Sequence, residues 1–139
     1  MRRKNKVLLV AAIAMAVAAY GGAIWYGWHV LTTWRAVRAL PWSASDVREY
    51  YQDSGFPLYD YFHYVKARMP ESEFPAYAAR LGLRPLAQHE RVAIWNSGEP
   101  GWWDPSSSLE GTHVRLDAPD GGTKAKWENG HVYVEAWQN

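Results

Sequence analysis

The fold is decided near the C-terminus by residues 124–135, which read KAKWENGHVYVE. The central dipeptide Asn129-Gly130 is the favoured two-residue type I′ turn of a β-hairpin, because both of its positions need positive φ. Folding the chain about this turn places Lys124 directly opposite Glu135. The stretch therefore predicts an antiparallel hairpin whose register is set by the turn itself.

The two faces of this hairpin differ sharply in polarity. One face is apolar and consists of Ala125, Trp127, Val132, Val134 and Ala136. The other face carries the charged and polar side chains, which are Lys124, Lys126, Glu128, His131, Tyr133 and Glu135. A register slip of one residue would bury these charges, so the alternation fixes the pairing of the two strands.

Working outward from the hairpin, four further segments have the composition of strands. They are residues 47–52, 58–68, 91–95 and 113–117. The second of them is rich in alternating aromatic side chains, which favour a pleated and half-buried surface.

A short helix is expected between these strands. Ser72 is a suitable N-cap, Pro75 is tolerated in the first helical turn, and Gly82 is a typical terminator. The apolar face of this helix would consist of Phe74, Tyr77, Ala78 and Leu81. Residues 43–139 are therefore predicted to form one α+β domain, a small antiparallel sheet with one packed helix.

Toward the N-terminus, residues 7–30 contain no Asp, Glu, Lys or Arg. As a helix this run would be about 36 Å long, enough to cross a hydrocarbon core of about 30 Å with some tilt. We expect one transmembrane helix over residues 7–34, preceded by a basic tail (1–6) and followed by a juxtamembrane extension (35–42). A cleaved signal peptide is the alternative, but the apolar run continues well past Ala19.

The charge distribution predicts how this helix is oriented. Residues 1–6 carry four basic side chains and no acidic one, and basic segments remain on the cytoplasmic side. We therefore expect a bacterial inner-membrane protein with a cytoplasmic N-terminus and a periplasmic C-terminal domain.

Two groups of side chains in and near the helix suggest contacts with its surroundings. A stripe of small residues at helical spacing would let another helix approach closely; it consists of Ala12, Ala16, Ala19, Ala23 and Gly27. The alternative is that the helix is simply rich in alanine. An aromatic and basic belt at the outer interface would comprise Trp25, Tyr26, Trp28, Trp34, Arg35 and Arg38.

His29 is the only residue in the apolar run with a side chain that titrates near neutral pH. An imidazole there could ligate haem or a (bacterio)chlorophyll, an arrangement similar to light-harvesting polypeptides, which are also single spanning helices with a pigment-binding histidine. Those polypeptides typically carry alanine four residues before the histidine, whereas this chain has Trp25. His29 also lies near the outer interface, so a hydrated histidine is the favoured interpretation and no cofactor is predicted.

The composition excludes several classes of function. The chain has 139 residues and no cysteine, which excludes disulfides, thiolate metal sites and a cysteine nucleophile. From residue 41 onward nine basic residues face fourteen acidic ones, so nucleic acid is not an expected partner.

Motifs for chemistry are also absent from the sequence. There is no phosphate-binding loop, zincin motif or nucleophile elbow, and the histidines after residue 41 occur singly. We therefore expect neither an enzyme nor a metal site, although an envelope enzyme with scattered His and Asp residues is a further alternative.

Adjacent tryptophans at 102 and 103 are the leading candidates for a binding surface. They lie in a stretch rich in Pro, Gly and Ser, and two neighbouring side chains of an extended chain point in opposite directions. One of the two is then expected to be exposed, as an anchor for a protein partner or as a stacking platform for a sugar ring. The alternative is that both pack beneath the loop.

Three features of the C-terminal domain resemble a group of bacterial membrane-anchored proteins to which no activity is assigned. These are residues 43–51, the Trp102-Trp103-Asp104-Pro105 tetrapeptide and the closing aromatic hairpin. The resemblance covers about the last hundred residues and implies one compact domain without implying any chemistry.

From these observations we expect a non-catalytic, single-pass accessory subunit of an inner-membrane complex. Its partners would be other membrane-protein subunits and the lipid bilayer, and a photosynthetic or respiratory assembly would be its host. The alternative function is a membrane-anchored periplasmic module that binds glycans through Trp102 and Trp103.

Overall fold

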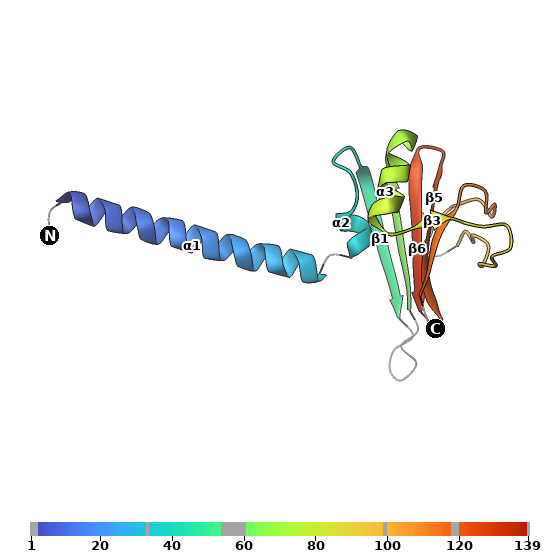
Figure 1. Ribbon diagram of the computed structural model, residues 1–139, viewed down its shortest axis with the longest axis horizontal. Coiled ribbons are helices and arrows are strands. Elements are labelled where there is room, and N and C mark those ends of the chain that lie inside the picture. The colour runs from blue at the N-terminus through green and yellow to red at the C-terminus, as the bar shows by residue number, and fades with distance from the viewer. Residues whose placement is uncertain (1–2, 33, 54–60, 99, 118–119, 139) are drawn as a thin grey trace. The chain divides into compact units, whose positions relative to one another are not determined.

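The structure, a computed structural model, describes residues 3–32, 34–53, 61–98, 100–117 and 120–138 (Figure 1). For residues 3–9 and 28–32 it describes the backbone alone. The chain consists of two units, one that ends at Trp34 and a compact one that begins at Arg35. Each unit is described separately below.

The first unit is one long helix, α1 (Arg3–Thr32). Its segment Val10–Gly27 is long and apolar enough to cross a membrane, and the side chains of residues 10–26 are all exposed within the unit. The helix begins earlier than the predicted residue 7, and it ends at Thr32, so Trp34 lies outside it. The following turn of helix, α2 (Arg35–Arg38), already belongs to the compact unit.

The compact unit is built on a six-stranded, fully antiparallel sheet with the order β1-β2-β6-β5-β4-β3. The strands are β1 (Ser45–Asp53), β2 (Tyr61–Arg68), β3 (Arg84–Pro85), β4 (His113–Asp117), β5 (Gly121–Glu128) and β6 (His131–Gln138). The fold class predicted from the sequence, an apolar N-terminal helix followed by a small antiparallel sheet with one packed helix, is confirmed.

The C-terminal hairpin has the predicted turn and the predicted register. Asn129 and Gly130 have φ values of 50° and 83°, as a type I′ turn requires. Lys124 lies opposite Glu135 in the β5–β6 ladder. This hairpin supplies the two central strands of the sheet, and all other elements are arranged around it.

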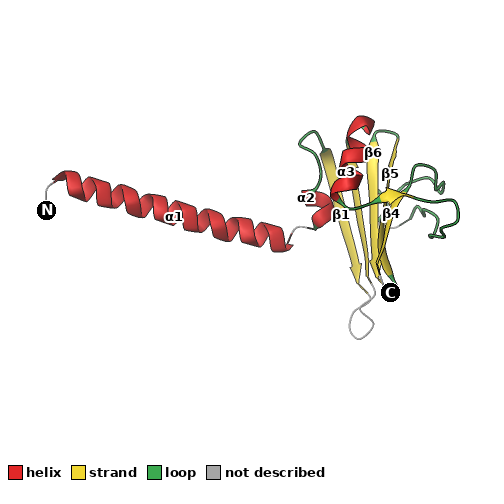
Figure 2. Ribbon diagram, in the orientation of Figure 1, coloured by secondary structure: helices red, strands yellow, loops and turns green. Residues whose placement is uncertain are grey.

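One apolar layer lies between the hairpin and a short helix, α3 (Phe74–Arg80), which crosses one face of the sheet (Figure 2). The predicted apolar face of the helix is buried there: Phe74, Tyr77, Ala78 and Leu81. The Trp127 indole donates a hydrogen bond of 2.8 Å to the carbonyl of Met69, which fixes the segment that enters the helix. This layer buries the apolar face of α3.

The ends of α3 correct one prediction and confirm another. Ser72 is not the N-cap, because a 3-10 turn, η1 (Glu71–Glu73), precedes the helix and no side chain caps either element. Pro75 does lie in the first helical turn. Gly82 ends the helix with a φ of 72°, a conformation that glycine adopts without strain.

The strand predictions succeeded except in one segment. Residues 113–117 form β4 with the predicted bounds, and β1 extends the predicted 47–52 in both directions. The predicted strand 58–68 is β2 from Tyr61 onward, and its first three residues lie outside the described part of the chain. The predicted strand at 91–95 is wrong, because these residues belong to a long irregular loop between β3 and β4.

Candidate functional site

The charged face of the hairpin does not face solvent. Lys124 and Lys126 are only 1% and 2% exposed, because the loop of residues 86–112 lies over this side of the sheet. The expectation that correct pairing keeps the hairpin's charges out of the interior is therefore wrong. The covered face and the cleft beside it are the part of the compact unit where polar chemistry is concentrated.

Lys124 binds the first part of this loop. Its Nζ donates hydrogen bonds to the carbonyl oxygens of Ala93, at 2.8 Å, and Ile94, at 3.4 Å. It also lies 3.4 Å from a carboxylate oxygen of Glu135. Residues 91–95 form no strand, and two of their carbonyl groups accept hydrogen bonds from an ammonium group instead of from a neighbouring strand.

Burial acts on both partners of this ion pair. It lowers the pKa of Lys124, and the attraction of Glu135 opposes that shift. It raises the pKa of Glu135, against the opposing effect of Lys124. Each charge is thus unfavourable alone in this site and depends on the other.

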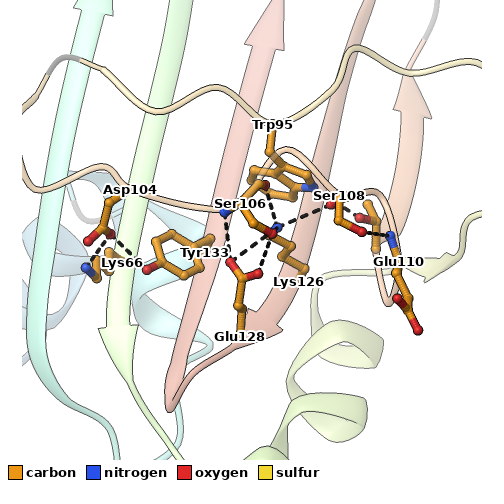
Figure 3. Close-up of polar contacts among 10 residues, drawn as sticks. Lys66, Trp95, Asp104, Ser106, Ser108, Glu110, Lys126, Glu128 and Tyr133 are labelled. Atoms are coloured by element: carbon orange, nitrogen blue, oxygen red, sulfur yellow. Dashed lines mark hydrogen bonds and ion pairs between the residues drawn. The ribbon is translucent and has the colours of Figure 1, made fainter.

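Lys126 holds the second part of the loop in the same way (Figure 3). Its Nζ donates to the carbonyl of Ser106 at 2.7 Å and to that of Ser108 at 3.2 Å. Glu128, on the same strand, accepts a bond of 2.9 Å from the Ser106 amide. Burial alone would raise the pKa of Glu128, but Ser106 and Lys126 together hold it below its usual value.

A third lysine, Lys66 on β2, holds the segment between these two attachments. Its Nζ lies 2.6 Å from a carboxylate oxygen of Asp104 and 3.3 Å from the carbonyl of Trp102. The hydroxyl of Tyr133 donates to the same Asp104 oxygen at 2.9 Å (Figure 3). Lys66 is the main cause of a lowered pKa at Asp104, and Tyr133 adds to it. We call Lys66, Lys124 and Lys126 the loop-binding lysines.

Aromatic side chains fill the space between the loop and the sheet. Trp95, Trp103 and Tyr133 form a buried cluster, and Trp103 has its ring centroid 4.9 Å from that of Tyr64. The ammonium groups of Lys124 and Lys126 lie 4.7 and 5.4 Å from the Trp95 ring, so cation–π attraction reinforces the hydrogen bonds.

The two tryptophans of the predicted binding pair differ in burial because of this cluster. Trp103 is 2% exposed and is part of the core. Trp102 is half-buried against the same cluster. Trp103 therefore cannot stack on a sugar ring or anchor a partner, and Trp102 alone retains accessible surface.

A cleft of about 430 Å³ opens beside the attachment made by Lys124. Its lining combines aromatic and aliphatic groups with five ionisable side chains: Phe62, Arg91, Val92, Ala93, Leu116, Asp117, Asp120, Gly121, Lys124, Glu135 and Trp137. Gly122 lies under its Trp137 wall, where a Cβ would come within 2.6 Å of the ring. The close fit of this ring on a glycine shapes the cleft.

Three of the ionisable groups in the cleft already have partners. Lys124 and Glu135 bind each other, Lys124 also binds the loop, and Asp117 accepts a bond of 3.1 Å from Arg115. What the cleft offers a small ligand is therefore carboxylate acceptors, the Arg91 guanidinium and aromatic surface. These groups can bind and orient a molecule, and their geometry assembles no nucleophile with a general base among the described residues.

Two histidines of the compact unit, His63 and His113, have structural partners. His63 Nε2 lies 2.6 Å from a carboxylate oxygen of Glu49; burial lowers the pKa of His63, and Glu49 opposes the shift. The ring of His113 packs edge-on against Phe74, with centroids 5.0 Å apart. Within the described ranges, no three His, Asp or Glu side chains are grouped so that they could hold a metal ion.

The predicted membrane-facing residues fall in both units. The small-residue stripe is on the surface of α1, where Ala12, Ala16, Ala19 and Ala23 are exposed. Of the predicted belt, Trp25 and Tyr26 are 68% and 65% exposed. The side chains of Trp28 and His29 lie outside the described part, so the pigment or haem hypothesis stays a prediction.

The remaining residues of the belt lie at the start of the compact unit. Trp34 is half-buried, and Arg35 and Arg38 are exposed. Arg35 donates a bond of 2.9 Å to the carbonyl of Arg80, so the segment predicted as a juxtamembrane extension is attached to α3.

The loop-binding lysines are the residues that sequence reasoning missed. Lys124 and Lys126 were recognised as one polar face of a hairpin, which is the usual reading of strict alternation. A signal was nevertheless present, because residues 86–112 form a long loop that carries three tryptophans and must bury them on some surface.

The pH dependence of stability should report the attachment at Asp104. The pKa of this carboxyl is below its usual value of 3.8 in the folded chain, so its stabilising effect is complete above that value and is lost as the pH falls through the lowered pKa. We expect Asp104→Asn to lose about 1 kcal/mol at neutral pH, a small value because the Asp104 carboxylate is exposed to solvent. The variant should also show a weaker acid dependence in urea unfolding followed by tryptophan fluorescence. Glu110→Gln, on the same loop, is the control and should behave as wild type.

No protein-family model matches this chain, and no curated protein or solved structure gives a significant match.

Proposed function

We propose that this protein is a non-catalytic, single-pass subunit of a bacterial inner-membrane complex. The observation that supports the proposal is that the buried and half-buried lysines bind backbone groups of the protein itself. Lys66, Lys124 and Lys126 each donate hydrogen bonds to carbonyl groups of one loop. These ammonium groups therefore hold the loop on the sheet, which is a structural role.

The membrane part of the proposal rests on α1. Its segment Val10–Gly27 is long and apolar enough to cross a bilayer. The basic residues before it favour a cytoplasmic N-terminus, which would place the compact unit in the periplasm. Insertion as a cleaved signal peptide would give a different product, a soluble protein without α1.

The small-residue stripe supports a packing role for this helix. Lipid tails provide no hydrophobic driving force between helices, so close backbone approach is a main source of association. Photosynthetic and respiratory assemblies recruit many small one-helix subunits, and we propose an assembly of this type as the host.

Bulky substitutions on the stripe test the packing role. Ala16→Leu with Ala23→Leu should abolish co-purification of partner subunits from membranes dissolved in mild detergent, because two isobutyl groups prevent close approach. The matched control is Ala14→Leu with Ala18→Leu, which adds the same bulk to the opposite side of α1 and should leave co-purification intact. Wild-type protein that migrates as a lone monomer without co-purifying proteins would contradict the proposal.

Topology is tested separately with a tag at the C-terminus. Protease added to spheroplasts should remove the tag, because the compact unit is proposed to lie outside the cytoplasm. A protected tag would refute the orientation, and a water-soluble product without α1 would refute the anchor.

The structure gives no support to glycan binding through the tryptophan pair, because Trp103 is buried. Fluorescence titration with peptidoglycan fragments remains the discriminating measurement. A saturable response would favour the glycan-binding alternative over the subunit.

A further inference from the structure

Among the described residues of the compact unit, Trp42 is the most exposed large apolar side chain. Its relative exposure is 106%, so the indole makes essentially no contact with the rest of the fold. It occupies the tip of a β-turn that is closed by a hydrogen bond of 3.0 Å from the Ala44 amide to the Pro41 carbonyl. A fully exposed indole on a short turn is a typical anchor for an external surface.

Hydrogen bonds on both sides of the turn attach it to the rest of the compact unit. Ser43, next to Trp42, donates a hydrogen bond to the carboxylate of Glu73. On the other side, Arg80 Nε donates to the carbonyl of Ala39 at 2.9 Å, and the Tyr77 hydroxyl donates to that of Ala36 at 2.7 Å. These bonds attach the whole segment from α2 to the turn onto η1 and α3.

Three exposed guanidinium groups accompany this turn. Arg35 and Arg38 lie on α2, and Arg80 lies on the part of α3 to which α2 is bonded. Glu73 is on the same side of the unit, and its carboxylate is bound by Ser43. The segment therefore combines an exposed indole with net positive charge, although the compact unit as a whole is acidic.

We propose that this face of the compact unit, formed by Arg35, Arg38, Trp42 and Arg80, docks on the anionic headgroups of the bilayer. The inference rests on α1 crossing that bilayer. A helix of 30 residues is about 45 Å long, which equals the thickness of a bilayer with its headgroup layers. Arg35 follows the last residue of α1 by three positions along the chain, so a bilayer crossing by α1 would leave the first residue of the compact unit within three residues of chain from the headgroup layer.

The chemistry of the face matches that surface. Tryptophan partitions to the membrane interface because its ring is apolar and its N–H can remain hydrated. Arginine near an anionic leaflet contributes by electrostatic attraction, which falls off within a Debye length. A protein partner would also accept an exposed indole, but the positive charge that accompanies Trp42 favours anionic lipid as the occupant, and the test below distinguishes the two.

The absence of cysteine from the chain allows a direct test. The full chain with Trp42→Cys is labelled with the fluorophore NBD and reconstituted into vesicles of phosphatidylcholine with phosphatidylglycerol, or of phosphatidylcholine alone. We expect quenching by spin-labelled lipid and a blue-shifted emission, stronger in the anionic vesicles. Ser107→Cys, exposed on the loop over the opposite face of the sheet, is the matched control and should remain water-accessible.

Charge is tested in the same system. Arg38→Gln should reduce the docking equilibrium about fivefold in anionic vesicles, which corresponds to about 1 kcal/mol for one arginine. Equal accessibility of positions 42 and 107 in both kinds of vesicle would overturn the proposal. Shielding of position 42 in native membranes but not in vesicles would also overturn it and would indicate a protein contact. Release of the chain from membranes by carbonate would overturn both this inference and the proposed function, whereas failed docking leaves α1 in the bilayer.

Discussion

Lys124→Met is expected to destabilise the compact unit by about 3–5 kcal/mol, the cost of removing one partner of a buried ion pair. The substitution leaves Glu135 buried without its counter-charge and removes the donor to the Ala93 carbonyl. Urea unfolding of the full chain in mild detergent, followed by tryptophan fluorescence, measures the loss.

The effect of this substitution should depend on pH in a defined direction. Burial raises the pKa of Glu135, and Lys124 opposes that shift in the wild-type protein. The variant lacks this opposing effect, so the pKa of Glu135 should rise further. The folded variant then favours the protonated carboxyl, so its stability should be lost as the pH rises through that raised pKa.

Two controls distinguish the effect of breaking the ion pair from the effect of removing a long cationic side chain. Arg91→Met removes an exposed cation from the same cleft and should change the free energy of unfolding by less than about 0.5 kcal/mol. The double variant Lys124→Met with Glu135→Leu should recover most of the stability, because it removes both charges. A single variant as stable as wild type would show that the pair does not support the fold.

Trp103→Ala should be destabilising to a similar degree, by about 3–5 kcal/mol, because it empties the centre of the loop cluster. Trp103 has its ring 6.0 Å from Trp95 and 5.4 Å from Tyr133, between centroids, and is 2% exposed. Loss of the ring should release the loop of residues 86–112, and limited proteolysis within that loop should accelerate.

Trp102→Ala is the matched control for this prediction. Its side chain is half-buried against the same cluster, so a loss of about 1–2 kcal/mol is expected. Equal losses for the two variants would show that the two indoles contribute equally, which contradicts the burial of Trp103 and the partial exposure of its neighbour.

Much of the fold could be predicted from local sequence. The hairpin register follows from Asn129-Gly130, because the φ preferences of two residues and the alternation of their flanks are short-range properties. The same holds for β4 and for the buried face of α3. The apolar run of α1 is likewise a property of composition and length.

The strand prediction failed at residues 91–95, where backbone carbonyl groups accept hydrogen bonds from a side chain that is distant in the sequence. Residues 91–95 have the composition of a strand, but they pair with no strand, and Lys124 binds two of their carbonyl groups. Composition indicates a preference for strand structure and does not indicate which group will bind the backbone carbonyls. The Trp102-Trp103 pair is a similar case, since only the packing decides which indole is buried.

The sequence by itself determined the hairpin, its register and the apolar N-terminal helix, because each depends on residues close together in the chain. Only the tertiary structure decided that the charged face of the hairpin is covered. A polar strand face is exposed or buried according to whether a loop about thirty residues away in the sequence packs its tryptophans and carbonyl groups against it. The free energy of burying Lys124 and Lys126 is offset by bonds that exist only once that loop is in place.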